Sequence, residues 1–119
     1  MMSARRNKEY FFILNELRRA SRRYNAPIWR YVRELLSRPK RRRVAVNISK
    51  LNRYTSENDV VVVPGKVLGA GDIDHRITVA AYDFSLTAYN KLREAGCEIL
   101  SIPELIERYP KGSGVKIIV

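Results

Sequence analysis

A chain of 119 residues, 45% of them apolar, can bury one compact core but is too short for two domains of ordinary size. Its formal net charge of +11 and its isoelectric point near 10.2 are far from those of an ordinary cytosolic enzyme, and they favour a polyanionic partner.

The positive charge is concentrated in the first half of the chain. Residues 1–54 carry 16 Lys and Arg against three acidic residues, a net charge of +13, whereas residues 55–119 have a net charge of −2. A basic stretch can be an ordinary solvated face, but concentration this strong argues against that interpretation. We therefore interpret the first half as a binding surface and the second half as a conventional folding unit.

The sequence predicts no targeting or membrane segment. The apolar run at residues 10–14 is too short for the core of a signal peptide, and no stretch approaches the ~20 apolar residues of a membrane span. The single cysteine, Cys97, excludes an internal disulfide and suits a reducing compartment. We expect a soluble, intracellular protein.

Two basic amphipathic helices are predicted first, over residues 5–24 and from Pro27 to just before Pro39. The positions expected to face a core are Tyr10, Ile13, Leu14, Leu17 and Tyr24 in the first helix, and Ile28, Tyr31, Val32, Leu35 and Leu36 in the second. Tyr31 lies on this apolar stripe and is assigned to the core. Trp29 and Tyr54 could either pack in the core or stack on bases, as could Tyr24.

An arginine-rich loop follows at residues 37–43, with five cations around a proline. Mutual repulsion should keep this segment extended when it is alone, while the neighbouring elements anchor both of its ends. Residues 44–49 then alternate between apolar and small or polar side chains, which predicts a half-buried strand that includes Ile48.

The second half alternates between strand and helix patterns. A buried strand at residues 60–63 is expected to stop at Pro64-Gly65, and a second short apolar segment covers residues 67–71. Further elements are a strand at 77–82, a helix capped by Asp83 or Ser85 and closed by Gly96, a strand at 98–100, a helix opened by a Ser101–Glu104 capping box, and strand residues 115–119 after a loop at 110–114. The predicted fold is α/β, a single small domain with short mixed strands and helices, preceded by basic amphipathic helices and an arginine-rich loop.

Patterns that could carry catalysis or bind a cofactor are weak. Residues 69–71 resemble part of a dinucleotide-binding fingerprint, but Asp74 stands where the third glycine belongs and would repel a pyrophosphate. Asp72, Asp74 and His75 are too few and too close in sequence to indicate a metal site, and Cys97 is expected to be a small buried hydrophobe. We therefore expect no catalytic residue, no metal and no cofactor.

The basic residues are the remaining candidates, because guanidinium groups donate forked hydrogen bonds to phosphates and stack on bases. The predicted RNA-binding residues are Arg18, Arg19, Arg22, Arg23, Arg38, Lys40, Arg41, Arg42, Arg43, Lys50, Arg53, Lys66, His75, Arg76 and Lys111. No signature of a known sequence-reading RNA module is present, so contact with RNA shape and backbone is favoured. Two alternatives remain. A chromatin-type DNA-binding protein would have the same charge, but the sequence shows no helix-turn-helix. A small RNA-modifying enzyme would need a catalytic group, and the sequence offers none.

Several of these segments together resemble one family. Residues 34–43, continuing through 46–51, resemble the signature of the archaeal and eukaryotic large-subunit ribosomal protein eighteen-e family. Residues 67–71 and 79–85 are similar to the core that this family shares with bacterial large-subunit ribosomal protein fifteen, and residues 110–114 are similar to its late loop. Val44 and Cys97 depart from the pattern, and Cys97 in place of a usual glycine makes a positive φ there unexpected.

The resemblance implies a structural, non-enzymatic component of the large ribosomal subunit in the cytoplasm. It also implies an irregular mixed α/β core. Together with the charge distribution, we expect a single ribosomal-protein domain over residues 1–119, in which residues 1–54 form a basic helical and extended RNA-binding portion and residues 55–119 an α/β core portion. The implied partners are large-subunit ribosomal RNA, bound through its backbone phosphates, and neighbouring ribosomal proteins, with no membrane and no small-molecule substrate. Because the chain ends at Val119 without the basic tail of eukaryotic members, an archaeal source is expected.

Overall fold

The computed structural model describes residues 4–119, with side chains from residue 7 onward, as a single α/β domain, which confirms the predicted fold class. The elements in chain order are α1 (Ala4–Arg23), α2 (Pro27–Leu36), the 3-10 helix η1 (Lys40–Arg42), β1 (Val44–Asn47), α3 (Ile48–Tyr54), β2 (Val60–Leu68), β3 (Thr78–Phe84), α4 (Leu86–Glu94), β4 (Glu98–Leu100), α5 (Ile102–Arg108) and β5 (Val115–Ile117).

All five strands join one parallel sheet. β2 pairs with β3 along one edge, and β3 pairs with β4. The other edge of β2 is shared, because β5 pairs with residues 60–62 and β1 pairs with residues 65–68. The long strand β2 therefore connects β1, from the basic half of the chain, to every strand of the second half except β4.

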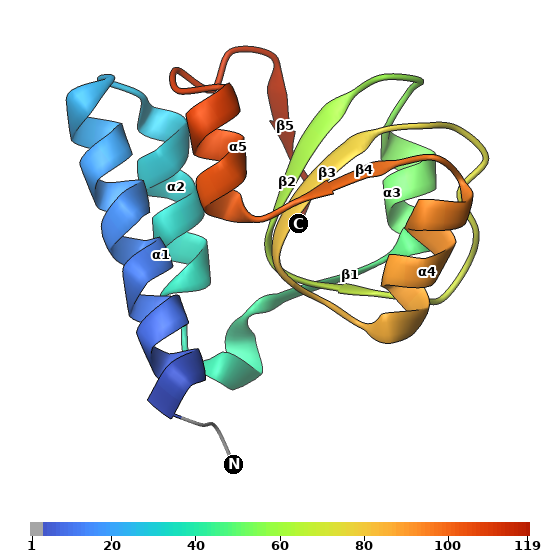
Figure 1. The fold of residues 1–119 in the computed structure, drawn as a ribbon, viewed down its shortest axis with the longest axis horizontal. Helices are drawn as coiled ribbons and strands as arrows, with labels where there is room; N and C mark the ends of the chain where they lie inside the picture. Colours follow the sequence, from blue (N-terminus) through green and yellow to red (C-terminus); the bar gives the residue numbers. More distant parts are fainter. Residues whose placement is uncertain (1–3) are drawn as a thin grey trace.

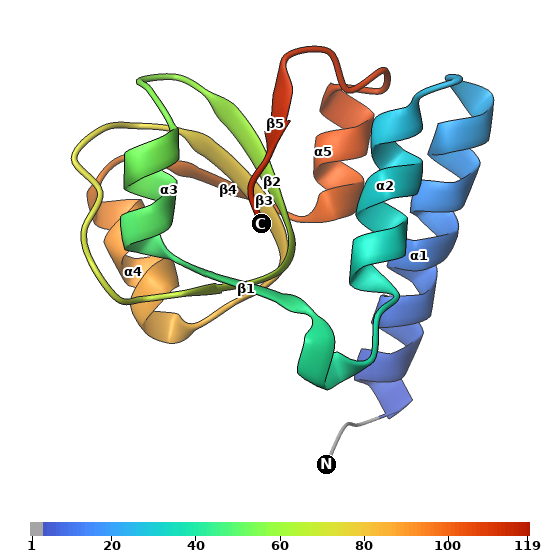
Figure 2. The same ribbon diagram turned by 180° about the vertical axis from the view of Figure 1, so that it is seen from behind.

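Helices cover both faces of the sheet, so the molecule has three layers (Figures 1 and 2). α1, α2 and α5 lie on one face, and α3 and α4 lie on the other. Side chains of β2 alternate between two apolar clusters: Val62 packs toward the first group of helices, whereas Val61 and Val63 pack toward the second. The β-branched run in β2 is thus explained by burial on both faces, as parallel strands require.

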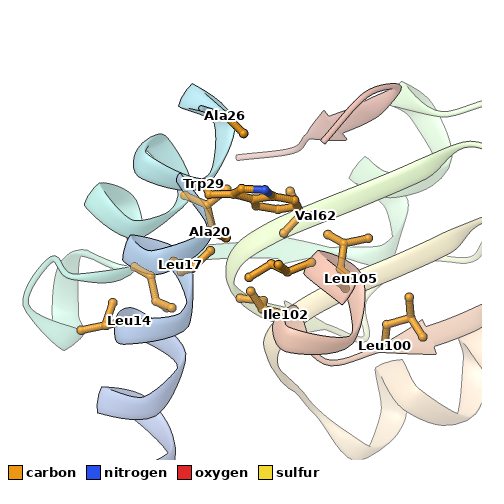
Figure 3. Close-up of a cluster of buried hydrophobic side chains, with 13 residues drawn as sticks. Leu14, Leu17, Ala20, Ala26, Trp29, Val62, Leu100, Ile102 and Leu105 are labelled. Atoms are coloured by element: carbon orange, nitrogen blue, oxygen red, sulfur yellow. The ribbon is translucent and has the colours of Figure 1, made fainter. Parts of the chain in front are cut away.

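The two predicted N-terminal helices are confirmed, but one side chain in the second helix was assigned wrongly. Trp29 is completely buried and reaches β2 and α5 in the cluster of Figure 3. Tyr31, which the apolar stripe placed in the core, is 48% exposed. The buried face of α2 is centred on Trp29, Val32 and Leu36, because that face meets the sheet, and Tyr31 lies outside it.

The prediction that a strand ends at Pro64-Gly65 was wrong, because β2 continues through both residues to Leu68. The pairing with β3 shifts register between Val63 and Lys66, which accommodates a residue that cannot donate to the ladder. Gly65 lies against β1, where an added Cβ would fall 1.9 Å from the Val44 carbonyl oxygen. Glycine here allows the close approach of the two strands.

The strand predicted through Ile48 ends instead at Asn47, and the unpredicted helix α3 begins at Ile48. Ile48 and Leu51 are both fully buried on the face of α3 that packs against the sheet. Ile48 fits the alternation of Val44 and Val46 in a strand, and it also fits the i, i+3 spacing to Leu51 in a helix. Only the packing against the sheet decides between strand and helix at this residue.

The remaining predicted elements of the second half are confirmed, with β5 ending at Ile117. Ser85, rather than Asp83, caps α4 by accepting a hydrogen bond from the Ala88 N–H at 3.1 Å. The Ser101–Glu104 capping box of α5 is present, with hydrogen bonds of 2.8 and 3.2 Å. Gly96 has a φ of +79° and Cys97 has no positive φ, as expected.

Candidate nucleic-acid interface

The arginine-rich segment forms a turn that is anchored between α2 and β1. Residues 40–42 make the 3-10 helix η1, closed by the Arg42 N–H donating to the Pro39 carbonyl at 2.7 Å. The turn lies beside the N-terminal end of α1 and leads directly into β1 (Figure 1). Four cations project from it as exposed side chains, here called the η1 cluster: Arg38, Lys40, Arg41 and Arg42.

Arg43, the last cation of this segment, is oriented toward the protein. Its guanidinium lies 4.3 Å from the centroid of the Tyr10 ring and 5.9 Å from that of Tyr82, and its Nε donates to the Arg38 carbonyl at 3.2 Å. The Tyr10 hydroxyl donates in turn to the Leu36 carbonyl at 3.0 Å. Arg43 therefore binds the turn to α1 and β3, which explains why like charges can fold together here.

Four arginines in the C-terminal half of α1, here called the α1 ridge, are all exposed: Arg18, Arg19, Arg22 and Arg23. Arg19 pairs with Glu16 at 3.4 Å, and the Arg23 guanidinium lies 5.4 Å from the centroid of the Tyr24 ring. The ridge lies in the C-terminal half of α1, so its far end is at the opposite end of the helical hairpin from the η1 cluster (Figure 1).

The loop that carries Lys111 lies near that far end. The Trp29 indole N–H donates to the Pro110 carbonyl at 2.7 Å, which holds the loop against the start of α2. A groove of about 840 Å³ separates the α1 ridge from α5, and its rim also includes Glu16 and Glu107. The charge around this groove is therefore mixed, whereas the η1 cluster contains only cations.

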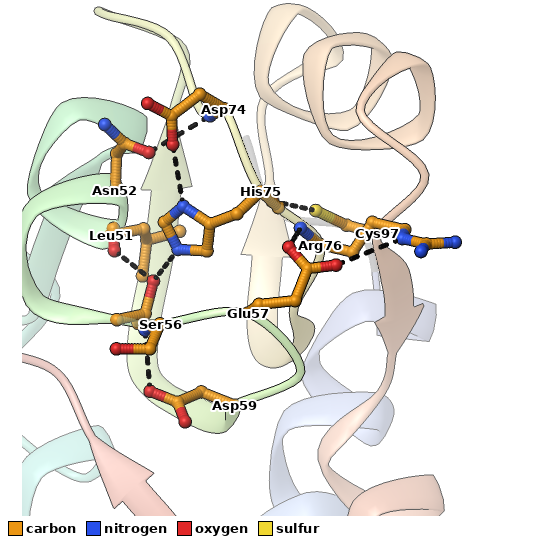
Figure 4. A network of polar contacts seen from close by, with 10 residues as sticks. Leu51, Asn52, Ser56, Glu57, Asp59, Asp74, His75, Arg76 and Cys97 are labelled. Carbon is orange, nitrogen blue, oxygen red and sulfur yellow. Dashed lines mark hydrogen bonds and ion pairs between the residues drawn. The ribbon is translucent and has the colours of Figure 1, made fainter.

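Cations predicted in the second half are mostly neutralised locally. Lys66 lies 3.9 Å from an Asp83 oxygen, and Arg76 pairs with Glu57 at 3.3 Å. The His75 side chain is 14% exposed. Its Nε2 shares a hydrogen bond of 2.7 Å with the Thr55 hydroxyl, and its Nδ1 lies 2.8 Å from an Asp74 oxygen (Figure 4).

The last two predicted cations, Lys50 and Arg53, lie on α3 on the other side of the sheet. Within the described part of the chain, neither forms an ion pair with a carboxylate, and the same holds for the η1 cluster and for Arg18, Arg22, Arg23 and Lys111. Apart from Arg43, the predicted cations without a carboxylate partner among the described side chains thus lie in three separate places: the η1 cluster, the α1 ridge with Lys111 near its far end, and α3 with Lys50 and Arg53.

Arg30 and Arg93 are examples of exposed cations that the sequence analysis did not select. Arg30 is exposed on α2 and has no carboxylate partner among the described side chains, and its place on the polar face of the predicted helix could have identified it. Arg93 on α4 lies over the exposed ring of Tyr89 at 5.7 Å. Neither lies in a basic run, which is why neither was selected.

Two groups of the second half, Glu98 and Cys97, have shifted pKa values. The hydrogen bond from Arg108 lowers the pKa of Glu98, and burial raises the pKa of the Cys97 thiol. Residues 4–119 contain no group of three His, Cys, Asp or Glu side chains that could hold a metal ion. No helix in the same range is long and apolar enough to cross a membrane.

Comparison with known proteins places the chain in a family. Three similar proteins are each named Large ribosomal subunit protein eL18. The protein from Pyrobaculum aerophilum is 49% identical over 113 residues, which is 95% of this chain and 93% of that protein. Those from Methanothermobacter thermautotrophicus and Archaeoglobus fulgidus are 45% and 43% identical, covering 94% and 95% of this chain and 93% and 97% of the relatives.

The family model described as Ribosomal protein 60S L18 and 50S L18e matches residues 2–119, almost the whole chain. This match and the three relatives confirm the resemblance that the motifs at residues 34–51 carried, and the chain belongs to this family of ribosomal proteins.

Proposed function

We propose that the protein is a structural constituent of the large ribosomal subunit in the cytoplasm, where it binds and stabilises folded ribosomal RNA through backbone phosphates. Its family supports the first part of this proposal, since the relatives are named as large-subunit proteins. The family is one of structural proteins, so the chain is not an enzyme. Neighbouring ribosomal proteins are further partners within the proposal.

One observation carries the RNA-binding part: in residues 7–54, the described side chains of the first half, most cations have no carboxylate partner, whereas most cations of the second half have one. Lys66, Arg76, Lys91, Arg108 and Lys116 all lie within 4 Å of a carboxylate oxygen. In the first half only Arg19 does so among the described side chains. Unpaired guanidinium groups keep their full capacity to attract phosphates and to release condensed counterions.

Whether a cation has a carboxylate partner decides how strongly we expect it to bind RNA phosphates. The η1 cluster, the unpaired arginines of the α1 ridge, Lys50, Arg53 and Lys111 are the phosphate contacts. Arg19, Lys66 and Arg76 contribute less, because RNA must compete with their carboxylate partners. Arg43 and His75 act by holding the loops that carry other cations.

The salt dependence of RNA binding tests this proposal. If about 6–10 phosphates are contacted, affinity for a large-subunit RNA fragment should fall about 10³- to 10⁵-fold between 50 and 200 mM salt. The full chain should also migrate with large subunits when a cell lysate is sedimented. Weak salt dependence, or a clear preference for duplex DNA in competition with structured RNA, would contradict the proposal.

A further inference from the structure

The unpredicted helix α3 presents an exposed aromatic ring. Tyr54, its last residue, is 56% exposed although α3 is otherwise anchored by the fully buried Ile48 and Leu51. An exposed aromatic face is a surface on which a base can stack, since every base has a π-face.

Two cations accompany this ring. Lys50 Nζ lies 6.0 Å and the Arg53 guanidinium carbon 5.4 Å from the ring centroid of Tyr54. Both cations lie over the ring in the outer part of the cation–π range, and the Tyr54 side chain is nevertheless more than half exposed, so part of the ring is accessible to a base. As shown above, neither cation has a carboxylate partner within the described chain.

The helix that carries these three side chains is held rigidly by the loop at residues 69–75. The Ala70 N–H donates to Asn47 Oδ1 at 3.2 Å, and the Ser49 N–H donates to the Ala70 carbonyl at 3.1 Å. Near the other end of α3, the Asp74 N–H donates to Asn52 Oδ1 at 3.1 Å (Figure 4). A preformed surface loses less conformational entropy when a ligand binds than a mobile one.

The end of α3 beside Tyr54 is fixed in the same way. The Thr55 hydroxyl donates to the Leu51 carbonyl at 2.6 Å and also hydrogen-bonds to His75, which contacts Asp74. The carboxylates of the supporting loop are themselves engaged, because Asp74 Oδ1 lies 2.8 Å from His75 Nδ1 and Asp72 lies 3.9 Å from Lys91. The Lys91 ammonium thereby partly compensates the negative charge next to α3.

We propose that Tyr54, Lys50 and Arg53 form a binding site for one unpaired nucleotide of RNA. The base stacks on the Tyr54 ring, and Lys50 and Arg53 contact the phosphates on its two sides. This inference rests on the proposed function and adds to it a preference for single-stranded positions, because bases inside a duplex are already covered by their neighbours. Phosphate contacts by the η1 cluster and the α1 ridge would give no such preference.

The test compares two RNA probes and one substitution. The probes are a hairpin with an unpaired uridine loop and a blunt duplex with the same stem, and binding of the full chain is measured by fluorescence anisotropy. Tyr54→Ala should weaken hairpin binding about 5- to 150-fold, because stacking contributes about 1–3 kcal/mol per base. Duplex binding and the slope of affinity against salt should not change, since no charge is removed.

Matched variants make the result specific. Tyr54→Phe keeps the ring and should bind the hairpin like the wild type, whereas Tyr54→Leu keeps the bulk and should lose affinity like Tyr54→Ala. Tyr31→Ala removes a similarly exposed tyrosine from α2, over which no cation lies within the described part of the chain, and should bind normally. All variants should keep the melting temperature of the wild type, because the rings removed are exposed.

A second readout is crosslinking of a 4-thiouridine placed in the hairpin loop, which should label the peptide that contains Tyr54. The site is overturned if Tyr54→Ala binds both RNAs as the wild type does, if it weakens both equally, or if Tyr31→Ala has the same effect. If the wild type itself shows no salt-dependent RNA binding, the proposed function fails and the site fails with it. Normal wild-type binding with an unaffected Tyr54→Ala variant overturns the stacking site alone.

Discussion

Arg41, Arg42 and Arg43 follow one another in sequence, yet their guanidinium groups occupy different environments. Arg41 and Arg42 are exposed on η1. Arg43 is half-buried and lies over Tyr10 while it donates to the Arg38 carbonyl. At the scale of single residues, one arginine of this run supports the structure and two are available to a partner.

Replacing these residues separately should reveal the difference. Arg41→Ala combined with Arg42→Ala should weaken RNA binding and lower the salt slope by about 2, because two phosphate contacts are removed. The melting temperature should be almost unchanged. Arg43→Ala should lower the free energy of unfolding by about 1–2 kcal/mol, since it loses a cation–π contact and a hydrogen bond.

Thermal unfolding followed by circular dichroism, together with RNA binding at several salt concentrations, measures both effects. The assignment of Arg43 would be wrong if Arg43→Ala were as stable as the wild type. It would also be wrong if the double variant lost as much stability as Arg43→Ala.

At the scale of elements, β2 determines where the basic half of the chain is held. Its residues 65–68 pair with β1, which comes directly after η1 and Arg43. Gly65 lies opposite Val44 in the register, where the backbones leave no room for a Cβ. The position of the η1 cluster therefore depends on a contact between two backbones.

Gly65→Ala tests this dependence. The new Cβ would lie 1.9 Å from the Val44 carbonyl oxygen, so β1 must move away from β2. We expect the free energy of unfolding to fall by about 1–3 kcal/mol or more, and RNA affinity to fall with it. Lys66→Ala is the matched control, because Lys66 is the next residue, exposed, and has only a 3.9 Å ion pair with Asp83 to lose. Urea denaturation of both variants provides the comparison, and equal midpoints would contradict the expectation.

At the scale of the whole molecule, ion pairs connect elements of the second half that lie apart in the sequence. Lys116 of β5 pairs with Asp59 before β2 at 2.8 Å, and Arg108 of α5 pairs with Glu98 of β4 at 2.6 Å. These hydrogen bonds lower the pKa values of Asp59 and Glu98, and the backbone N–H of Ser101 lowers the pKa of Glu104. All three carboxylates are thus favoured in their charged form by the folded state.

The sign of the pH dependence follows from these directions. A carboxyl group whose folded pKa lies below its unfolded pKa contributes stability above its ordinary pKa of about 4, and this stability is lost as pH falls through the folded pKa. Protonation also increases the net positive charge of a chain that already carries +11. We expect the urea midpoint to decrease steadily below about pH 5.

Glu98→Gln should show a weaker pH dependence than the wild type, because one of the three groups no longer titrates. Glu107→Gln should retain the wild-type dependence, since Glu107 is exposed and forms no ion pair among the described side chains. A urea midpoint that does not change with pH would show that these ion pairs do not stabilise the fold.

Much of the molecule could be predicted from the sequence because its signals are local. The helices α1, α2, α4 and α5 have amphipathic spacing or side-chain caps, as Ser85 and Ser101 show, and both kinds of signal lie within a few residues of one another. The motifs at residues 34–51 identified the family, and the uneven distribution of charge identified the basic half as the candidate interface.

The sequence by itself thus determined the helices α1, α2, α4 and α5, the family and the identity of the basic residues, whereas the tertiary structure decided how these parts are used. Only the sheet decides that β2 continues through Pro64-Gly65 and that Ile48 begins a helix. Only folding brings Arg76 to Glu57 and Arg43 to Tyr10, and so separates engaged cations from free ones. The physical reason is that pairing, burial and charge compensation depend on distances between residues far apart in the chain, which local sequence patterns do not encode.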